Sequence, residues 1–331
     1  MHPALSVIFF TSVSGLGYGL LFLAGLAAAI EPLRLDPIVT MLATALGTAF
    51  AAAGLTSSML HLGKPLRAWR AFSQWRSSWL SREGVASLIC FGPALLLFAF
   101  AWHYGNAIAL QTLGASAALA VRVAGGALAA CAALTVFCTA RIYTSLQTIA
   151  AWHNGYVLPG YLLFALLGGA APLWLLVLAA GGDPPASLTR GLPVLVAVAA
   201  LAVALLKYAY WRFVDRAPPA ATPESATGLG RFGTVRGVEA PHTEENYLTR
   251  EMGFVLARKH RAPLRTIAVM LFAVLPAAVA LFAIASASPA AGLVAAIAAA
   301  LLVMAGTFVE RWLFFAEAKH VVMLYYAGAR A

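Results

Sequence analysis

The chain has 331 residues, of which 62% are hydrophobic and only 10% are charged, and its mean hydropathy is +0.85. Soluble domains carry about 25% charged residues, so this composition excludes a soluble enzyme, a disordered protein and a nucleic-acid-binding domain. The net charge of +10 therefore does not indicate a nucleic-acid partner and instead fits the cytoplasmic face of a membrane protein.

Eight apolar runs are long enough to cross a bilayer, because a spanning helix needs about 20 apolar residues. The first run begins almost at Met1 without a basic segment before it, so we expect it to stay in the mature protein rather than act as a signal peptide. The sequence predicts an all-α integral membrane protein, a single bundle of eight transmembrane helices within residues 1–331. The runs cover about residues 6–30, 38–61, 82–103, 113–140, 157–181, 190–212, 264–286 and 289–315.

The basic residues divide unequally between the two sides of the predicted bundle. An even number of helices places both termini on one side, where 19 of the Lys and Arg residues fall. The other side has three, Arg34, Arg122 and Arg190. Because basic residues concentrate in cytoplasmic loops, we expect both termini to face the cytoplasm of a bacterial inner membrane.

Residues 213–263, between the sixth and seventh helices, form the one long polar insertion. Its first part, Arg216–Gly237, is rich in Pro, Gly, Ala and Thr and is predicted to be irregular. Its second part, Thr243–His260, is predicted to be a helix that Thr243 or Asn246 caps, with acidic residues early and basic residues at its end.

The chain has three cysteines, Cys90, Cys131 and Cys138, all within apolar runs and none in a CxxC pair. A four-iron cluster needs about four thiolate ligands, so we expect no cluster and no metal site in this chain. We expect these cysteines to be buried apolar side chains without a chemical role.

The densest polar segment joins the second and third helices. His61 is expected at the end of the second helix, and Ser81 is expected to cap the third, with Glu83 in its first turn. Each charge can simply complement a helix dipole or anchor the chain at the headgroups.

Titratable groups at membrane depth are, however, usually functional. A quinone site would use them, because histidine titrates near neutral pH, a carboxylate can relay protons and aromatic side chains can hold the ring. A transport pathway could use the same groups.

Two motifs in this segment resemble the membrane-anchor subunit of the dimethyl sulfoxide reductase (DmsC) family. They are His61-Leu-Gly-Lys-Pro-Leu-Arg67 and Ser78-Trp79-Leu80-Ser81-Arg82-Glu83. The resemblance covers essentially the whole chain. It implies the anchor of a three-subunit molybdoenzyme, with a molybdopterin catalytic subunit and a four-cluster iron–sulfur subunit as partners. It also implies a membrane quinone, ubiquinone or menaquinone, at His61, Arg67 and Glu83.

Two further features resemble the anchors of cytoplasmic sulfite-oxidising molybdoenzymes (the SoeC type). One is the opening residues 2–11, and the other is the insertion, with Gly230-Arg231-Phe232-Gly233, Pro241-His242-Thr243 and Tyr247-Leu248. This resemblance implies electron flow from sulfite to quinone. The anchor of a dimethyl sulfoxide or polysulfide (NrfD-type) reductase working from quinol is the nearest alternative, although the Ser78–Glu83 motif weighs against the polysulfide type.

Other polar residues near the same side can line the pocket or serve as interface anchors. Glu310 lies inside a spanning run and so needs a partner such as Arg311 or water. These possible lining residues are Trp69, Trp79, Arg82, Arg141, Tyr143 and Glu310.

Two alternatives are a haem site and a transport function. A haem b needs two facing histidines; His103 lies at the far side, whereas His61, His153 and His320 share the cytoplasmic side. The family resemblance implies no haem, so we expect none. A transporter or channel usually has broken helices near the midplane, whereas the helix centres here are rich in Ala, Leu and Val, which favours an anchor.

Overall fold

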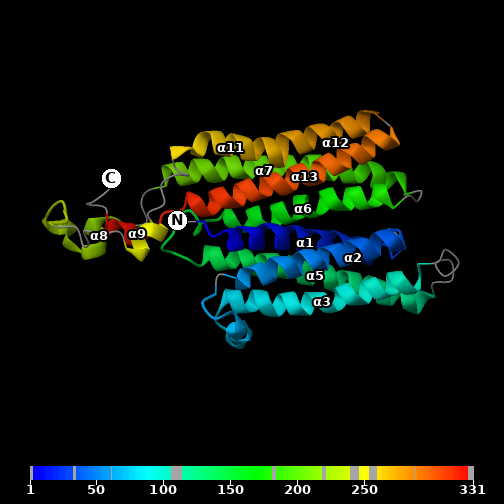
Figure 1. The fold of residues 1–331 in the computed structure, drawn as a ribbon, viewed down its shortest axis with the longest axis horizontal. Helices are drawn as coiled ribbons and strands as arrows, with labels where there is room; N and C mark the ends of the chain where they lie inside the picture. Colours follow the sequence, from blue (N-terminus) through cyan, green and yellow to red (C-terminus); the bar gives the residue numbers. More distant parts are fainter. Residues whose placement is uncertain are drawn as a thin grey trace.

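The computed structural model describes residues 3–32, 35–60, 62–105, 114–180, 184–217, 221–238, 246–252, 259–286 and 288–326. Within these ranges, eight helices are long and apolar enough to cross a membrane, and Figure 1 shows them side by side in one elongated bundle. The predicted fold and its eight spans are confirmed. The spans are α1 (Leu5–Ile30), α2 (Pro37–Met59), α3 (Trp79–His103), α5 (Ala115–Thr144), α6 (Val157–Ala179), α7 (Ala186–Arg216), α11 to α12 (Arg261–Ser286) and α13 (Pro289–Ala316).

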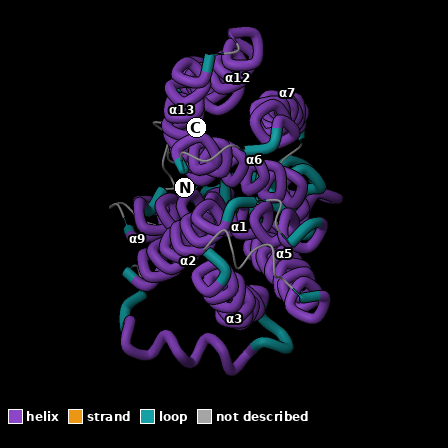
Figure 2. The backbone as a smooth tube through the Cα atoms, turned by 90° about the vertical axis from the view of Figure 1, so that its right-hand side faces the viewer, coloured by secondary structure: helices purple, strands orange, loops and turns teal. Residues whose placement is uncertain are grey.

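Helix α1 is the centre of the bundle, because it packs against α2, α5, α6 and α13. Figure 2 shows it enclosed by its neighbours. Glycines allow the closest approaches: a Cβ at Gly19 would lie 1.7 Å from the carbonyl oxygen of Ala165 in α6. Gly25 and Gly125 make the same kind of contact between α1 and α5. Lipid is as apolar as a leucine side chain, so the hydrophobic effect does not drive spanning helices together. Close backbone packing of this kind stabilises their association instead.

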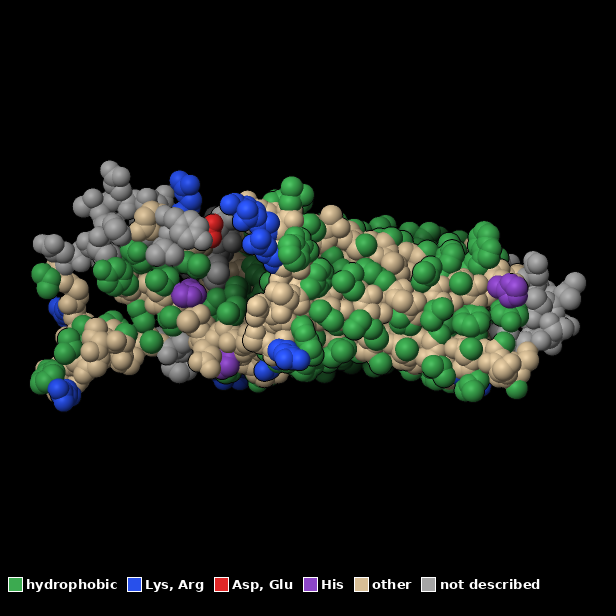
Figure 3. Space-filling model, turned by 90° about the horizontal axis from the view of Figure 1, so that it is seen from below, with side chains coloured by type: hydrophobic (Ala, Val, Ile, Leu, Met, Phe, Trp, Pro, Cys, Tyr) green, Lys and Arg blue, Asp and Glu red, His purple; other side chains and the backbone are tan. Residues whose placement is uncertain are grey.

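The sides of the bundle are apolar and its charges gather at one end. In Figure 3 the flank of the long bundle is largely hydrophobic, and Lys and Arg side chains collect at the left, where the bundle stops. Both termini lie at this end (Figure 1), which we call the terminal end. This distribution is that of a protein whose flank contacts lipid and whose ends contact water.

The described part of the insertion lies beyond the terminal end (Figure 1). The part predicted to be irregular contains two short helical turns, α8 (Pro223–Thr227) and η2 (Leu229–Phe232). They form because Thr222 and Ser225 make a capping box at the start of α8. The helix predicted over Thr243–His260 is described only in part, as α9 (Tyr247–Met252); residues 239–245 and 253–258 lie outside the described residues.

The seventh span changes register in its middle. A π-helical turn, η3 (Met270–Val274), separates α11 (Arg261–Val269) from α12 (Leu275–Ser286). Pro276 has no N–H to donate to the carbonyl of Phe272, so the regular ladder breaks here. The turn packs closely on α13, where a Cβ at Gly306 would lie 2.4 Å from the Phe272 nitrogen.

Candidate functional site

The segment between α2 and α3 carries most of the predicted site. It forms a 3₁₀ helix, η1 (Pro65–Gln74), at the terminal end next to the start of α3 (Figure 1). Ser78, not Ser81, caps α3, because the Ser78 hydroxyl accepts from the Ser81 nitrogen at 3.4 Å. The Ser81 hydroxyl instead donates to the carbonyl of Ala71. The predicted cap is therefore wrong, and the earlier start of α3 places Glu83 in its second turn rather than its first.

Glu83 is fully enclosed by the bundle, with 3% of its surface exposed. The hydroxyl of Thr139 on α5 donates to Glu83 Oε1. Thr139 Oγ1 also lies 3.0 Å from the Thr135 carbonyl oxygen within its own helix. Among the described residues, the carboxylate is thus held by a neutral hydroxyl from the facing helix.

Trp79 lies one turn before Glu83 on the same face of α3. Two guanidinium groups lie over its ring: the Cζ of Arg82 is 4.2 Å from the ring centroid and the Cζ of Arg141 is 5.1 Å from it. The ring of Phe137 on α5 contacts Trp79 edge-on, with centroids 5.9 Å apart. The structure therefore brings together four of the predicted residues, Trp79, Arg82, Glu83 and Arg141. We call this group the Trp79–Glu83 site.

Arg82 also ties this site to the preceding segment. Its Nε donates to the Trp75 carbonyl at 3.0 Å, and its Nη2 donates to the Arg76 carbonyl at 2.6 Å. Phe72 of η1 covers the next turn of α3, because a Cβ at Gly84 would lie 2.9 Å from its ring. The site consequently lies where η1 meets α3 and α5.

Two other predicted residues of this segment, Arg67 and Trp69, lie apart from the site. Arg67 is exposed on η1, and so is Trp69, with the Arg70 guanidinium 5.6 Å from its ring centroid. Exposed Leu66 and Trp69 on η1, with exposed Trp75 directly after it, form an apolar surface suited to the membrane interface. His61 lies outside the described residues.

Tyr143 and Glu310 belong to a different part of the bundle. Tyr143 packs among the aromatic rings of Trp152, Tyr161, Phe314 and Phe315, with centroids 5.4–5.7 Å away. It therefore helps build the core between α5, α6 and α13 rather than the Trp79–Glu83 site.

Glu310 is buried on α13, and Lys207 on α7 donates to its Oε1 at 2.6 Å. Arg311 Nη1 lies 3.4 Å from Glu310 Oε2. The expected partner Arg311 is confirmed, and Lys207 is a second partner that the sequence-based expectation did not include. A lysine inside the predicted span 190–212 was the signal that could have identified it.

The described histidines and cysteines make no metal cluster. No group of three or more His, Cys, Asp or Glu within the described ranges can hold a metal ion. His153 Nδ1 lies 2.6 Å from the Thr144 carbonyl oxygen, and His320 Nδ1 accepts from the Val322 nitrogen at 3.0 Å. His103 lies at the end of α3 away from the terminal end, as predicted.

Comparison with known proteins decides the family. The model of the DMSO reductase anchor subunit (DmsC) family matches residues 1–316. The chain belongs to the DmsC family. This DmsC-family protein is 32% identical to a sulfite dehydrogenase subunit of Allochromatium vinosum, over 98% of its own length and 99% of the relative. It is 28% identical to a component of the anaerobic dimethyl sulfoxide reductase of Escherichia coli K12, over 39% of its own length and 42% of the relative. No solved structure matches it significantly.

This membership confirms the resemblance seen in the two motifs. The DmsC-family protein is a multi-pass membrane anchor subunit, of the kind found in dimethyl sulfoxide reductase and sulfite dehydrogenase complexes.

Proposed function

We propose that this anchor passes electrons between an iron–sulfur subunit and a membrane quinone at the Trp79–Glu83 site. The observation that carries the proposal is the convergence of an indole ring, two guanidinium groups and a buried carboxylate at the terminal end of one helix pair. A planar ring with two oxygens fits this set, because aromatic faces hold the ring and charged donors reach the oxygens.

Each residue has a definable task in this chemistry. Reduction of a quinone takes two electrons and two protons, and negative charge develops on the ring oxygens as electrons arrive. Arg82 and Arg141 stabilise that charge because their donors are already in place. Glu83 gives up and regains a proton beside the ring. The family resemblance alone assigns His61 and Arg67 to the same quinone; Arg67 is exposed on η1, and His61 lies outside the described residues.

The electrons come from partner subunits docked on the terminal end. We infer that an iron–sulfur subunit binds loops 62–82 and 213–263, where the basic residues are concentrated, and that the complex also includes a molybdopterin subunit. Crosslinks from these two loops should reach the iron–sulfur subunit. Crosslinks only from the opposite loops, near Gly105 and Pro184, would contradict this docking face.

The orientation follows from the charge count. We infer that the terminal end faces the cytoplasm of a bacterial inner membrane, because basic residues accumulate there. A C-terminal fluorescent protein that folds only in the cytoplasm should be bright. High activity of a C-terminal alkaline phosphatase fusion would contradict this orientation.

The direction of flow is inferred to be from sulfite to quinone, because the relative that matches nearly the whole chain is a sulfite dehydrogenase subunit. The second candidate is a dimethyl sulfoxide reductase working from quinol, which the Escherichia coli relative favours over a shorter region. The purified heterotrimeric complex, assayed with sulfite and with dimethyl sulfoxide, separates the two candidates.

The site itself is tested with Glu83→Gln and His61→Ala in the heterotrimeric complex. Both variants should assemble and keep dye-linked activity of the catalytic subunit. Quinone turnover should fall at least about tenfold, since positioned acid–base groups contribute ~10²–10⁴-fold. Glu31→Gln, the same change at an exposed position at the far end of α1, is the matched control. Wild-type quinone turnover in both site variants would place the site elsewhere.

A further inference from the structure

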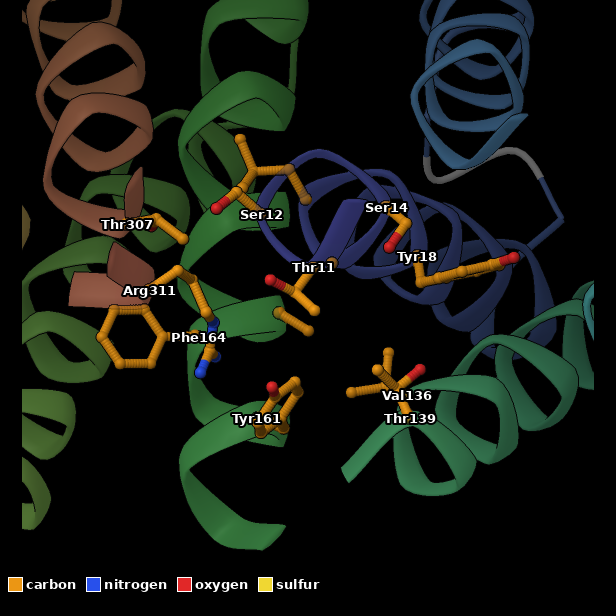
Figure 4. A pocket seen from close by; sticks show the side chains of 13 residues that line it. Thr11, Ser12, Ser14, Tyr18, Val136, Thr139, Tyr161, Phe164, Thr307 and Arg311 are labelled. Carbon is orange, nitrogen blue, oxygen red and sulfur yellow. The ribbon is translucent and has the colours of Figure 1, made fainter. Parts of the chain in front are cut away.

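A second polar region lies deeper in the bundle, between α1, α5, α6 and α13. It surrounds a small cavity of about 10 Å³, close to the space that one ordered water needs. Figure 4 shows Arg311 reaching from α13 toward Tyr161 of α6, with Thr11 of α1 beside them and Thr139 on the far side. Hydroxyl and guanidinium groups from four helices therefore face one internal space.

Several atoms around this cavity are buried without a hydrogen-bond partner in the described part of the chain. They are Ser12 Oγ, Tyr18 Oη, Tyr161 Oη and Arg311 Nε, together with the neighbouring Glu310 Oε2. Buried donors and acceptors are almost always satisfied, and ordered water does this where protein atoms do not. Five such atoms within one region therefore indicate hydration rather than a dry void.

A charged cluster borders the cavity on its α13 side. Lys207, Glu310 and Arg311 together carry a net charge of +1 and are each at most 5% exposed. Arg311 is held over the Tyr161 ring, with its Cζ 3.9 Å from the centroid. Burial of such charges is costly unless they are paired and hydrogen-bonded, so this cluster needs the polar cavity beside it.

Thr139 connects the cavity to the Trp79–Glu83 site. Its side chain lines the cavity, and its hydroxyl donates to Glu83. The cavity thus reaches the back of Glu83, away from η1.

The charged cluster connects in turn to the water at the terminal end. Lys207 Nζ lies 4.9 Å and Arg265 Cζ lies 5.3 Å from the centroid of the Trp211 ring, and Arg265 is joined to Glu317 at 2.6 Å. Arg265 is paired with Asp215 at 2.7 Å, and the Asp215 side chain is one-third exposed. Polar groups therefore continue from the surface, through the cluster and the cavity, to Glu83.

We propose that this series of groups is a hydrated proton path to Glu83 from the α7–α13 side of the bundle. The inference rests on the proposed quinone chemistry. For each quinone reduced, two electrons arrive from the iron–sulfur subunit and two protons enter at Asp215 and Glu317. They cross the cavity by water held on Tyr161, Ser12 and Arg311 and reach Glu83, which transfers them to the quinone oxygens; quinol oxidation reverses each transfer.

Tyr161→Phe and Ser12→Ala test the path most cleanly. Ser12→Ala removes a hydroxyl that makes no hydrogen bond to the described protein residues, and Tyr161→Phe removes one hydroxyl but keeps its ring, so a purely structural role predicts little loss of stability or activity. The path predicts slower quinone turnover in the heterotrimeric complex, by about tenfold for the double variant, the low side of the ~10²–10⁴-fold range of acid–base groups. The solvent deuterium effect on turnover should rise, while the melting temperature and the quinone KM stay unchanged.

The control is Tyr208→Phe, the same change at an exposed position of α7. A water-resolving cryo-EM map of the wild-type complex should show ordered water bonded to Tyr161 Oη and Arg311 Nε, and Tyr161→Phe should lose it. Wild-type turnover in the double variant together with a dry cavity would overturn the path. If Glu83→Gln is impaired in the same assay, the quinone site stands without this path; if Glu83→Gln is also unimpaired, the proposed function itself fails.

Discussion

The two buried carboxylates of this anchor occupy contrasting environments within two turns of the terminal end. Glu310 lies between Lys207 and Arg311, on helices of one half of the bundle. Glu83 lies in the other half, where its described partner is the neutral hydroxyl of Thr139. A carboxylate held by two cations is stabilised as an anion, whereas one held by a hydroxyl can accept a proton at lower cost. The first suits a fixed charge, and the second suits proton exchange.

The largest expected effect is a loss of stability when the buried Lys207–Glu310 pair is broken. Lys207→Met removes one partner of a buried ion pair, which costs about 3–5 kcal/mol, so the anchor should lose most of its assembly with partners. Lys207→Arg keeps a cation beside Glu310 and should retain most of that stability. Thermal unfolding of the detergent-solubilised complex measures both. Lys207→Met as stable as Lys207→Arg would show that the pair is not a fixed charge.

The next effect concerns α1, which joins the two halves. A Cβ at Gly169 would lie 2.1 Å from the Gly19 carbonyl carbon, so Gly169→Ala must push α6 away from α1. Overpacking of this kind costs about 1–3 kcal/mol, and the melting temperature should fall. Gly92→Ala is the control, because its Cβ meets no atom within 4 Å. Equal melting temperatures for the two variants would contradict the close α1–α6 contact.

A smaller effect is expected at the hydroxyl that holds Glu83. Thr139→Val removes the hydrogen bond and should lower stability by about 1 kcal/mol and quinone turnover several-fold. Thr135→Val, one turn earlier on α5, removes only a bond to the Cys131 carbonyl and serves as the control. Comparable quinone turnover in the two variants would show that Thr139 does not position Glu83.

The smallest effect on stability is expected at the exposed ion pair of Arg261 and Asp215. Arg261 is half exposed and pairs with Asp215 at 3.0 Å, so Arg261→Gln should change the free energy of unfolding by only about 0.2–1 kcal/mol. That loss should shrink further as salt is added, because screening weakens exposed pairs. A loss of unfolding free energy as large as that of Lys207→Met would contradict the assignment of Arg261 and Asp215 to the exposed surface.

Much of the architecture could be predicted from the sequence, because length and apolar composition suffice to identify spanning helices. Arg311 could be expected beside Glu310, but the approach of Lys207, Tyr161 and Ser12 to this region could not be predicted, since these three residues lie in three different apolar runs. The sequence alone does not indicate which of the apolar runs pack against one another in the bundle. The convergence of Trp79, Arg82 and Glu83 followed from local spacing, whereas Arg141 and Thr139 join them only through the packing of α3 on α5. The close packing of the π-helical turn at Met270–Val274 on Gly306 of α13 likewise appears only in the folded bundle.

Infrared difference spectroscopy of the heterotrimeric complex, comparing its oxidised and reduced quinone states, tests the central claim most directly. Glu83 should change protonation as the quinone is reduced, so a carboxylic C=O band should appear or shift in the wild-type protein. The account predicts that Glu83→Gln abolishes this band and that Glu310→Gln leaves it in place. A band that survives Glu83→Gln, or that disappears only in Glu310→Gln, would contradict the assignment of proton exchange to Glu83.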